Sequence, residues 1–192
     1  MKLTKLAALS TLLIANTALA DWQLQQPSEV TFVSGKNSHL LEIHRFEKIA
    51  GSVSDQGQAS ITIDLSSIDS RIPVRDQRMR DHLFEVNSFA SAEIQAQIPA
   101  DVMTSIKQGK ISSVELPATL SLHGNDEELV LKLLVAPGKQ GELVVTSLAP
   151  VLIHADDFAL TKGIQLLRDI AKLKVIGEVV PVTFALTFVP AK

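Results

Sequence analysis

The sequence contains no cysteine and no tyrosine, and Trp22 is its only tryptophan. Without cysteine there is no disulfide bond and no thiol nucleophile, so a hydrophobic core has to hold the fold together. The scarcity of aromatic side chains argues against carbohydrate as a ligand, because proteins usually stack sugars on aromatic rings. Nucleotide-binding glycine loops and a Gly-x-Ser-x-Gly nucleophile elbow are also missing from the sequence.

The first twenty residues have the pattern of a secretory signal peptide. Lys2 and Lys5 precede an apolar run at residues 6–15, and Ala18-Leu19-Ala20 is a small-x-small cleavage site. We therefore expect residues 1–20 to be cleaved, which leaves residues 21–192 as one domain in the periplasm. The alternative is that the segment stays attached as an N-terminal anchor.

The net charge of the expected mature chain is negative. From residue 21 on, 16 lysines and arginines stand against 21 aspartates and glutamates, a formal charge of −5. This balance argues against nucleic acid or anionic lipid headgroups as the main partner. No stretch reaches the roughly 18 apolar residues that a membrane-spanning helix requires, so we do not expect the chain to span a membrane.

Apolar residues alternate with polar ones through most of the chain, which is typical of half-buried β-strands. Turn sequences, among them Gly124-Asn125-Asp126 and residues 137–141, separate the alternating runs. Many strands joined by short turns predict an all-β fold, an antiparallel β-barrel of about eight strands. Two segments differ: residues 72–89 are rich in charge, and residues 161–174 have helical spacing. We expect one or two short helices at the barrel ends.

The order of several motifs resembles the YceI-like family. Trp22 precedes Ser28-Glu29-Val30-Thr31-Phe32, and a later strand ends in Ser67-Ile68-Asp69. The pair Arg75-Asp76 then opens a segment that ends at Leu83-Phe84, and residues 120–124 and Asp157-Phe158 match further on. The resemblance covers the whole expected mature chain.

The resemblance implies a lipocalin-like barrel whose elongated apolar cavity holds a polyisoprenoid or quinone-like lipid, with no other cofactor. We expect a non-enzymatic protein that carries or stores this lipid. The candidate cavity residues are Val30, Phe32, Ile61, Ile63, Phe84, Phe89, Leu120, Leu122, Leu131, Leu133, Val145, Phe158, Leu167, Phe184 and Leu186.

Arg75 and Arg80 have two interpretations. A guanidinium group near the cavity mouth is a directed donor for a lipid headgroup. The structural interpretation is that these arginines form ion pairs that tie the charged segment across the barrel end.

Other classes of function stay open from sequence alone. The five histidines lack the spacing of a metal site, so we expect no bound metal. Asp81-His82 is the candidate reactive pair if the protein is a lipid-modifying enzyme. A third alternative is an interaction module with a solidly packed barrel, and homodimerisation is left open.

Overall fold

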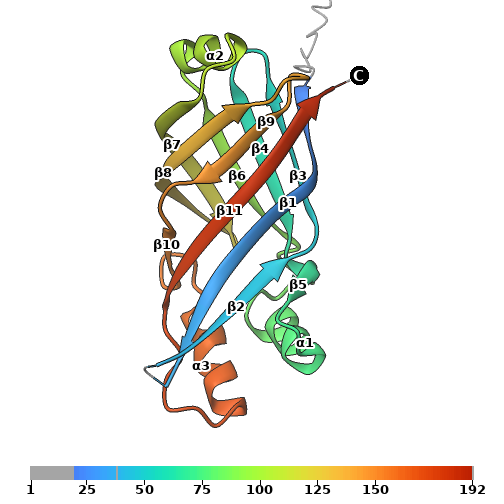
Figure 1. Ribbon diagram of the computed structural model, residues 1–192. Coiled ribbons are helices and arrows are strands. Elements are labelled where there is room, and N and C mark those ends of the chain that lie inside the picture. Colours follow the sequence, from blue (N-terminus) through green and yellow to red (C-terminus); the bar gives the residue numbers. More distant parts are fainter. Residues whose placement is uncertain (1–19, 38, 192) are drawn as a thin grey trace, which may run out of the picture.

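The chain forms one closed antiparallel β-barrel with helices at both ends (Figure 1). The computed structural model describes residues 20–37 and 39–191, with side chains from residue 22 on. The predicted signal peptide therefore lies outside the described residues, apart from the backbone of Ala20. The strands are β1 (Ala20–Lys36), β2 (Leu40–Phe46), β3 (Ile49–Ser54), β4 (Gln58–Asp64), β5 (Ile68–Asp69), β6 (Ser91–Gln97), β7 (Ser112–Leu122), β8 (Asn125–Pro137), β9 (Leu143–Ser147), β10 (Val151–His154) and β11 (Val179–Pro190).

Eight strand positions close the barrel, because three of these positions are each made by two successive strands. β2 and β3 both pair with β1, β5 continues the line of β4 by pairing with β2, and β9 and β10 both pair with β11. The circuit closes where β1 pairs antiparallel with β11, from Trp22 opposite Pro190 to Phe32 opposite Val182. The predicted all-β barrel of about eight strands is confirmed.

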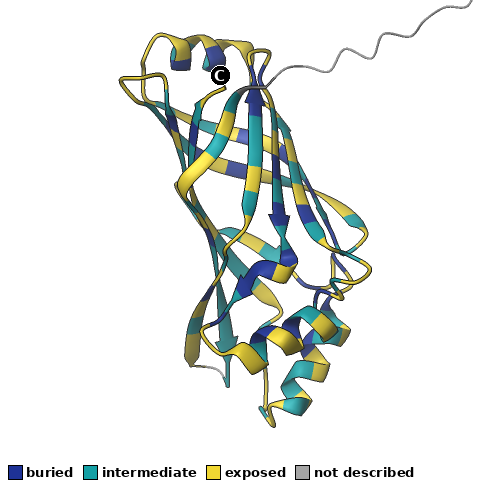
Figure 2. Cartoon of the chain, turned by 90° about the vertical axis from the view of Figure 1, so that its right-hand side faces the viewer, coloured by how far each residue is buried: buried dark blue, intermediate teal, exposed yellow. Residues whose placement is uncertain are grey.

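The alternating sequence pattern becomes an inside and an outside of the barrel. Along β7, for example, Leu116, Ala118 and Leu120 are buried, whereas Glu115 and Pro117 are exposed. Figure 2 shows the same alternation of buried and exposed positions on several strands. Successive side chains of a strand point to opposite faces, so one face of each strand forms the interior.

Within the described residues, three α-helices accompany the barrel: α1 (Pro73–His82), α2 (Ala100–Lys107) and α3 (Thr161–Ile170). α2 lies at one end, and α1 and α3 lie side by side at the other (Figures 1 and 2). The two helices meet closely, since a Cβ atom on Gly163 of α3 would lie 2.5 Å from the carbonyl oxygen of His82. No helix among the described residues is long and apolar enough to cross a bilayer.

Two details of the helices differ from the sequence predictions. The part of the chain that the structure describes has three α-helices rather than one or two, because α2, with its buried Met103 and Ile106, was not predicted. The predicted helix 161–174 ends at Ile170, since Lys172 takes a left-handed backbone conformation with φ of 53°. The backbone N–H of Lys174 then donates to the side-chain oxygen of Asn37, which holds this segment against the β1–β2 turn.

Candidate ligand cavity

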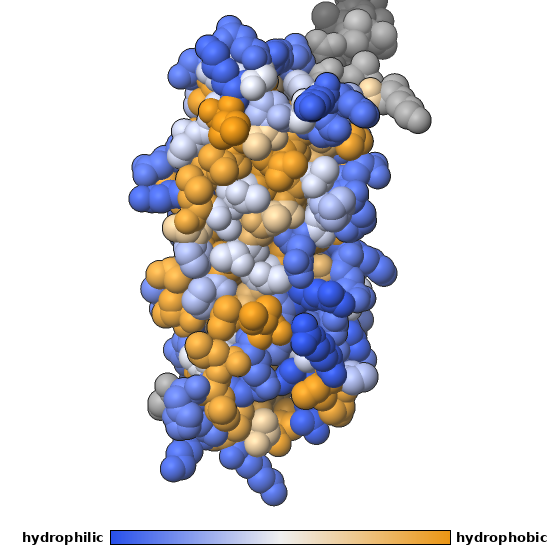
Figure 3. Space-filling model, in the orientation of Figure 1, coloured by the Kyte–Doolittle hydropathy of each residue, from blue (hydrophilic) through white to orange (hydrophobic). Residues whose placement is uncertain are grey.

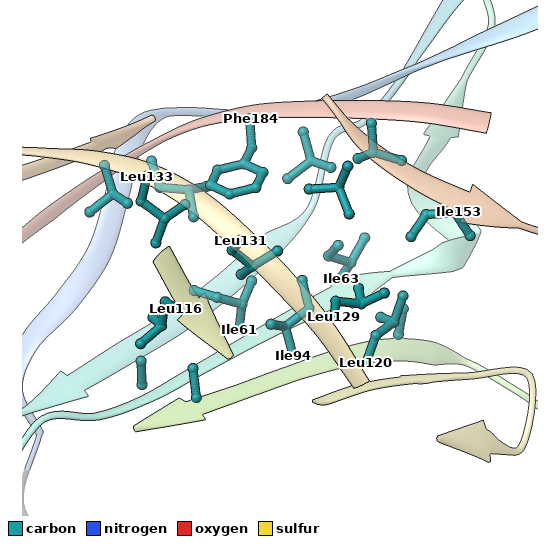
Figure 4. Close-up of a pocket in the computed structure, with 18 of the residues that line it drawn as sticks. Ile61, Ile63, Ile94, Leu116, Leu120, Leu129, Leu131, Leu133, Ile153 and Phe184 are labelled. Atoms are coloured by element: carbon teal, nitrogen blue, oxygen red, sulfur yellow. The ribbon is translucent and has the colours of Figure 1, made fainter. Parts of the chain in front are cut away.

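The barrel encloses an apolar cavity of about 230 Å³. All 36 described residues that line it are alanine, valine, leucine, isoleucine or phenylalanine. The lining extends from Val102 and Ile106 of α2 to Leu160 and Ile164 at α3, so it runs from one end of the barrel to the other. Since roughly 10–15 Å³ of such space holds one water molecule, the cavity is large enough for a substantial apolar ligand. Figure 4 shows part of this lining, with side chains from several strands pointing toward a common interior.

Most of the residues nominated from the sequence lie on this lining. They reach it because each occupies an inward position of its strand or, in the case of Phe84, follows α1. The nominated residues found on the lining are Val30, Phe32, Ile61, Ile63, Phe84, Leu120, Leu122, Leu131, Leu133, Val145, Phe184 and Leu186.

Three nominated residues lie elsewhere. The ring of Phe89 packs on the imidazole of His123, with ring centroids 4.2 Å apart. Phe158 is almost fully buried within the core, and Leu167 of α3 packs against that core without reaching the cavity. Conversely, Val102 and Ile106 were missed because no helix was predicted around them. Their apolar spacing within residues 102–106 was the signal available in the sequence.

The inner face of the β1–β2 pair changes from apolar to charged toward the α1–α3 end. Val30 lies opposite Phe46, and both line the cavity. The next inward pair is Phe32 and His44, whose rings make an edge-on contact at 5.1 Å between centroids. The pair after that is Ser34 and Glu42. The apolar lining thus ends at His44, Ser34 and Glu42, which we call the polar layer.

Arg75 of α1 ties this polar layer together. Its guanidinium donates to the carboxylate of Glu42 at 2.6 Å, to the Ser70 hydroxyl at 2.8 Å and to the Ser70 carbonyl at 2.6 Å. Lys36 also pairs with Glu42. The neighbouring carboxylate of Asp76 is buried and accepts hydrogen bonds from the backbone N–H and the hydroxyl of Ser70. Arg75 is therefore engaged within the protein rather than on the cavity lining.

Arg80 occupies a different environment on the same helix. Its guanidinium donates to the Ser66 carbonyl at 3.4 Å and to the side-chain oxygen of Gln77 at 3.0 Å, both in exposed positions. Neither Arg75 nor Arg80 lines the cavity. The two headgroup candidates from the sequence are thus a partly buried clamp and a surface side chain.

The polar layer perturbs two pKa values. Burial alone would raise the pKa of Glu42, but hydrogen bonds and positive charge from Lys36 and Arg75 outweigh it and lower the pKa to about 2. Burial lowers the pKa of His44, the charge of Arg75 adds to this, and Glu42 opposes it, so the pKa is about 4. His44 is consequently neutral at pH 7.

We expect acid to destabilise the protein through His44. Its folded pKa of about 4 lies below the ordinary 6.5, so below pH 6.5 the unfolded state binds the additional proton. The free energy of unfolding should therefore fall by about 3 kcal/mol between pH 7 and pH 4, as a shift of this size implies. Urea unfolding at a series of pH values measures this decline, and His44→Leu should remove most of it, leaving the smaller decline that Glu42 causes near pH 4. An equal decline in the variant would contradict the assignment.

The remaining candidate reactive groups do not converge. Asp81 accepts hydrogen bonds from the side chain of Gln77 at 2.8 and 3.0 Å, and adjacent helical positions such as Asp81 and His82 do not face each other. Within residues 20–37 and 39–191, no group of three or more histidine or carboxylate side chains is arranged to hold a metal ion.

Comparisons with known proteins agree with this architecture. The family model described as YceI-like domain matches residues 22–188. The solved structure of a polyisoprenoid binding domain from Saccharophagus degradans, implicated in plant cell wall breakdown, is 35% identical, with a TM-score of 0.86 over 90% of this chain and 100% of that chain.

More distant solved structures share the fold. BcnA of Burkholderia cenocepacia is 17% identical, with a TM-score of 0.65 over 83% of this chain and 95% of that chain. The YceI protein of Campylobacter jejuni is 14% identical, with a TM-score of 0.54 over 78% of this chain and 84% of that chain. Comparison with curated protein sequences gives no significant match.

Proposed function

The chain belongs to the family of YceI-like domains, and from this premise we propose that it binds a long apolar lipid, polyisoprenoid or quinone-like, inside its barrel. The observation that carries the proposal is the cavity, because the 36 residues of its described lining all have hydrocarbon side chains. The polyisoprenoid binding domain that is 35% identical to this chain supports the same ligand class.

The driving force would be removal of apolar surface from water. Each methylene buried contributes roughly 0.8 kcal/mol before the cost of ordering the ligand. A lipid tail that follows the cavity from α3 toward α2 buries many such groups, so affinity does not need a strong polar contact. The tail, rather than the headgroup, then supplies most of the binding energy.

We propose a role in carriage or storage rather than catalysis. A reaction on the bound tail would need a nucleophile or a proton donor within reach, and the lining supplies neither. A cavity of this size also argues against the alternative of an interaction module with a solidly packed barrel. The signal-peptide pattern at residues 1–20 supports export, and we propose the periplasm as the site of action.

Two measurements test the lipid proposal. Native mass spectrometry of protein purified from its own cells, followed by organic extraction, should reveal a prenyl lipid in near-stoichiometric amount. Titration of delipidated protein with prenyl alcohols of increasing length should then show affinity that rises with each isoprene unit until the cavity is full. A clean mass without lipid, together with no binding at any chain length, would overturn the proposal.

A further inference from the structure

Two segments far apart in the sequence form a single projection at the α1–α3 end. The backbone N–H of Asn37 donates to the carbonyl of Val175 at 3.0 Å, and the N–H of Lys174 donates to the Asn37 side chain at 2.9 Å. Gly177 likewise donates to the carbonyl of Gly35 at 2.8 Å. We call the described residues of 36–43 and 172–179 the hairpin tip.

The hairpin tip exposes large apolar side chains. Leu41, Ile43 and Leu40 are 73%, 66% and 52% exposed. Leu41 and Ile43 take outward positions of β2, on either side of the inward Glu42. Val175 and Val179 are exposed on the other segment of the tip. Figure 3 shows apolar surface in both halves of the molecule, including the lower half, where β10, β2 and the lower ends of β1 and β11 lie (Figure 1). Exposed apolar groups gathered in this way mark an interaction surface.

The charge of the hairpin tip is opposite to that of the remaining molecule. The tip has three lysines and two glutamates, whereas the remaining described residues have twelve lysines and arginines and nineteen aspartates and glutamates. Glu42 is already neutralised by Lys36 and Arg75. Lys172 and Lys174 are exposed, and within the described part of the chain neither forms an ion pair. The formal charge of −5 on the expected mature chain, residues 21–192, therefore conceals a local positive site.

We propose that the hairpin tip docks on an anionic lipid bilayer surface. Leucines would enter the boundary between headgroups and acyl chains while lysines contact the headgroup phosphates, as at other interfacial surfaces. A second copy of the chain is a poorer occupant, because two tips face to face would bring their unpaired lysines together. Repulsion between the acidic barrel and the anionic membrane would orient the protein with its hairpin tip toward the bilayer.

This surface lies at the α1–α3 end of the barrel, which the cavity lining also reaches. Leu160, the residue before α3, and Ile164, near the start of α3, both line the cavity. The chain continues from the end of α3 into the hairpin tip. Docking would therefore orient this end of the cavity toward the bilayer. The proposal itself does not depend on what fills the cavity.

Vesicle flotation without any prenyl lipid tests the docking separately from ligand binding. The protein should float with vesicles of phosphatidylglycerol and phosphatidylethanolamine, and much less with phosphatidylcholine alone. The double variant Leu40→Ser, Leu41→Ser should weaken this partitioning at least tenfold, because two apolar side chains no longer insert. Ile111→Ser is the matched control, since Ile111 is 70% exposed outside the tip and should have no effect.

Charge variants complete the test. Lys172→Gln and Lys174→Gln should each weaken binding to the anionic vesicles about fivefold, and 0.5 M salt should reduce binding by the parent protein. Equal flotation of the leucine variant and the parent would overturn the proposal. So would a concentration-dependent dimer in sedimentation experiments that the leucine variant abolishes, because the tip would then bind a second copy.

Discussion

Ala96→Phe is expected to weaken the binding of a long prenyl lipid by about tenfold to one hundredfold while leaving the barrel folded. Ala96 of β6 lines the cavity and lies between Ala59 of β4 and Ala118 of β7 in the sheet register. Three neighbouring strands therefore present their smallest side chains at one level. A ring added there occupies space that the lipid needs, and the expected tenfold to one hundredfold loss of affinity corresponds to about 1.4–2.8 kcal/mol.

The control for this substitution places the same ring on the outside of the barrel. Ala185 of β11 is exposed, so Ala185→Phe should change neither the affinity nor the thermal unfolding midpoint appreciably. Calorimetric titration of the delipidated parent, Ala96→Phe and Ala185→Phe proteins with one prenyl alcohol compares their affinities. Full affinity in a well-folded Ala96→Phe protein would mean that the lipid does not occupy this level of the cavity.

The barrel was predictable from the sequence because burial on one face of a strand is a local pattern. Ile61 and Ile63 alternate with Thr62 and Asp64, and this alone assigns their inward orientation. Helix α2 was not predicted because eight residues with two buried side chains give little periodic signal. The end of α3 depends on the left-handed conformation of Lys172, which its sequence neighbours do not specify.

The site was less predictable than the fold, for reasons of three-dimensional packing. Phe158 and Phe184 are both apolar and both packed in the core, but only the second faces the cavity. Whether a core side chain borders empty space or another side chain depends on distant elements. In the same way, the partners of Arg75 include Glu42, which is 33 positions away in the sequence.

That long-range contact leads to the second large effect, a loss of stability on removal of Arg75. Arg75→Ala would delete three hydrogen bonds, two to Ser70 and one to the carboxylate of Glu42. Hydrogen bonds that involve a charged partner each contribute about 1.5–3 kcal/mol, and the loss of one ion-pair partner leaves the other partly unpaired. Since Lys36 still neutralises Glu42, we expect the free energy of unfolding to fall by about 3 kcal/mol. Urea unfolding followed by the fluorescence of Trp22 measures it.

Arg80→Ala is the matched control on the same helix. Its hydrogen bonds to Ser66 and Gln77 are exposed, so its removal should cost less than about 1 kcal/mol. Under conditions where both variants are folded, each should bind a prenyl phosphate as tightly as the parent, because neither arginine lines the cavity. A folded Arg75→Ala protein that loses affinity for the prenyl phosphate, yet keeps it for the corresponding alcohol, would show that Arg75 contacts the headgroup. Loss of stability with unchanged affinity would instead identify Arg75 as the clamp that holds α1 against β2 at the polar end of the cavity.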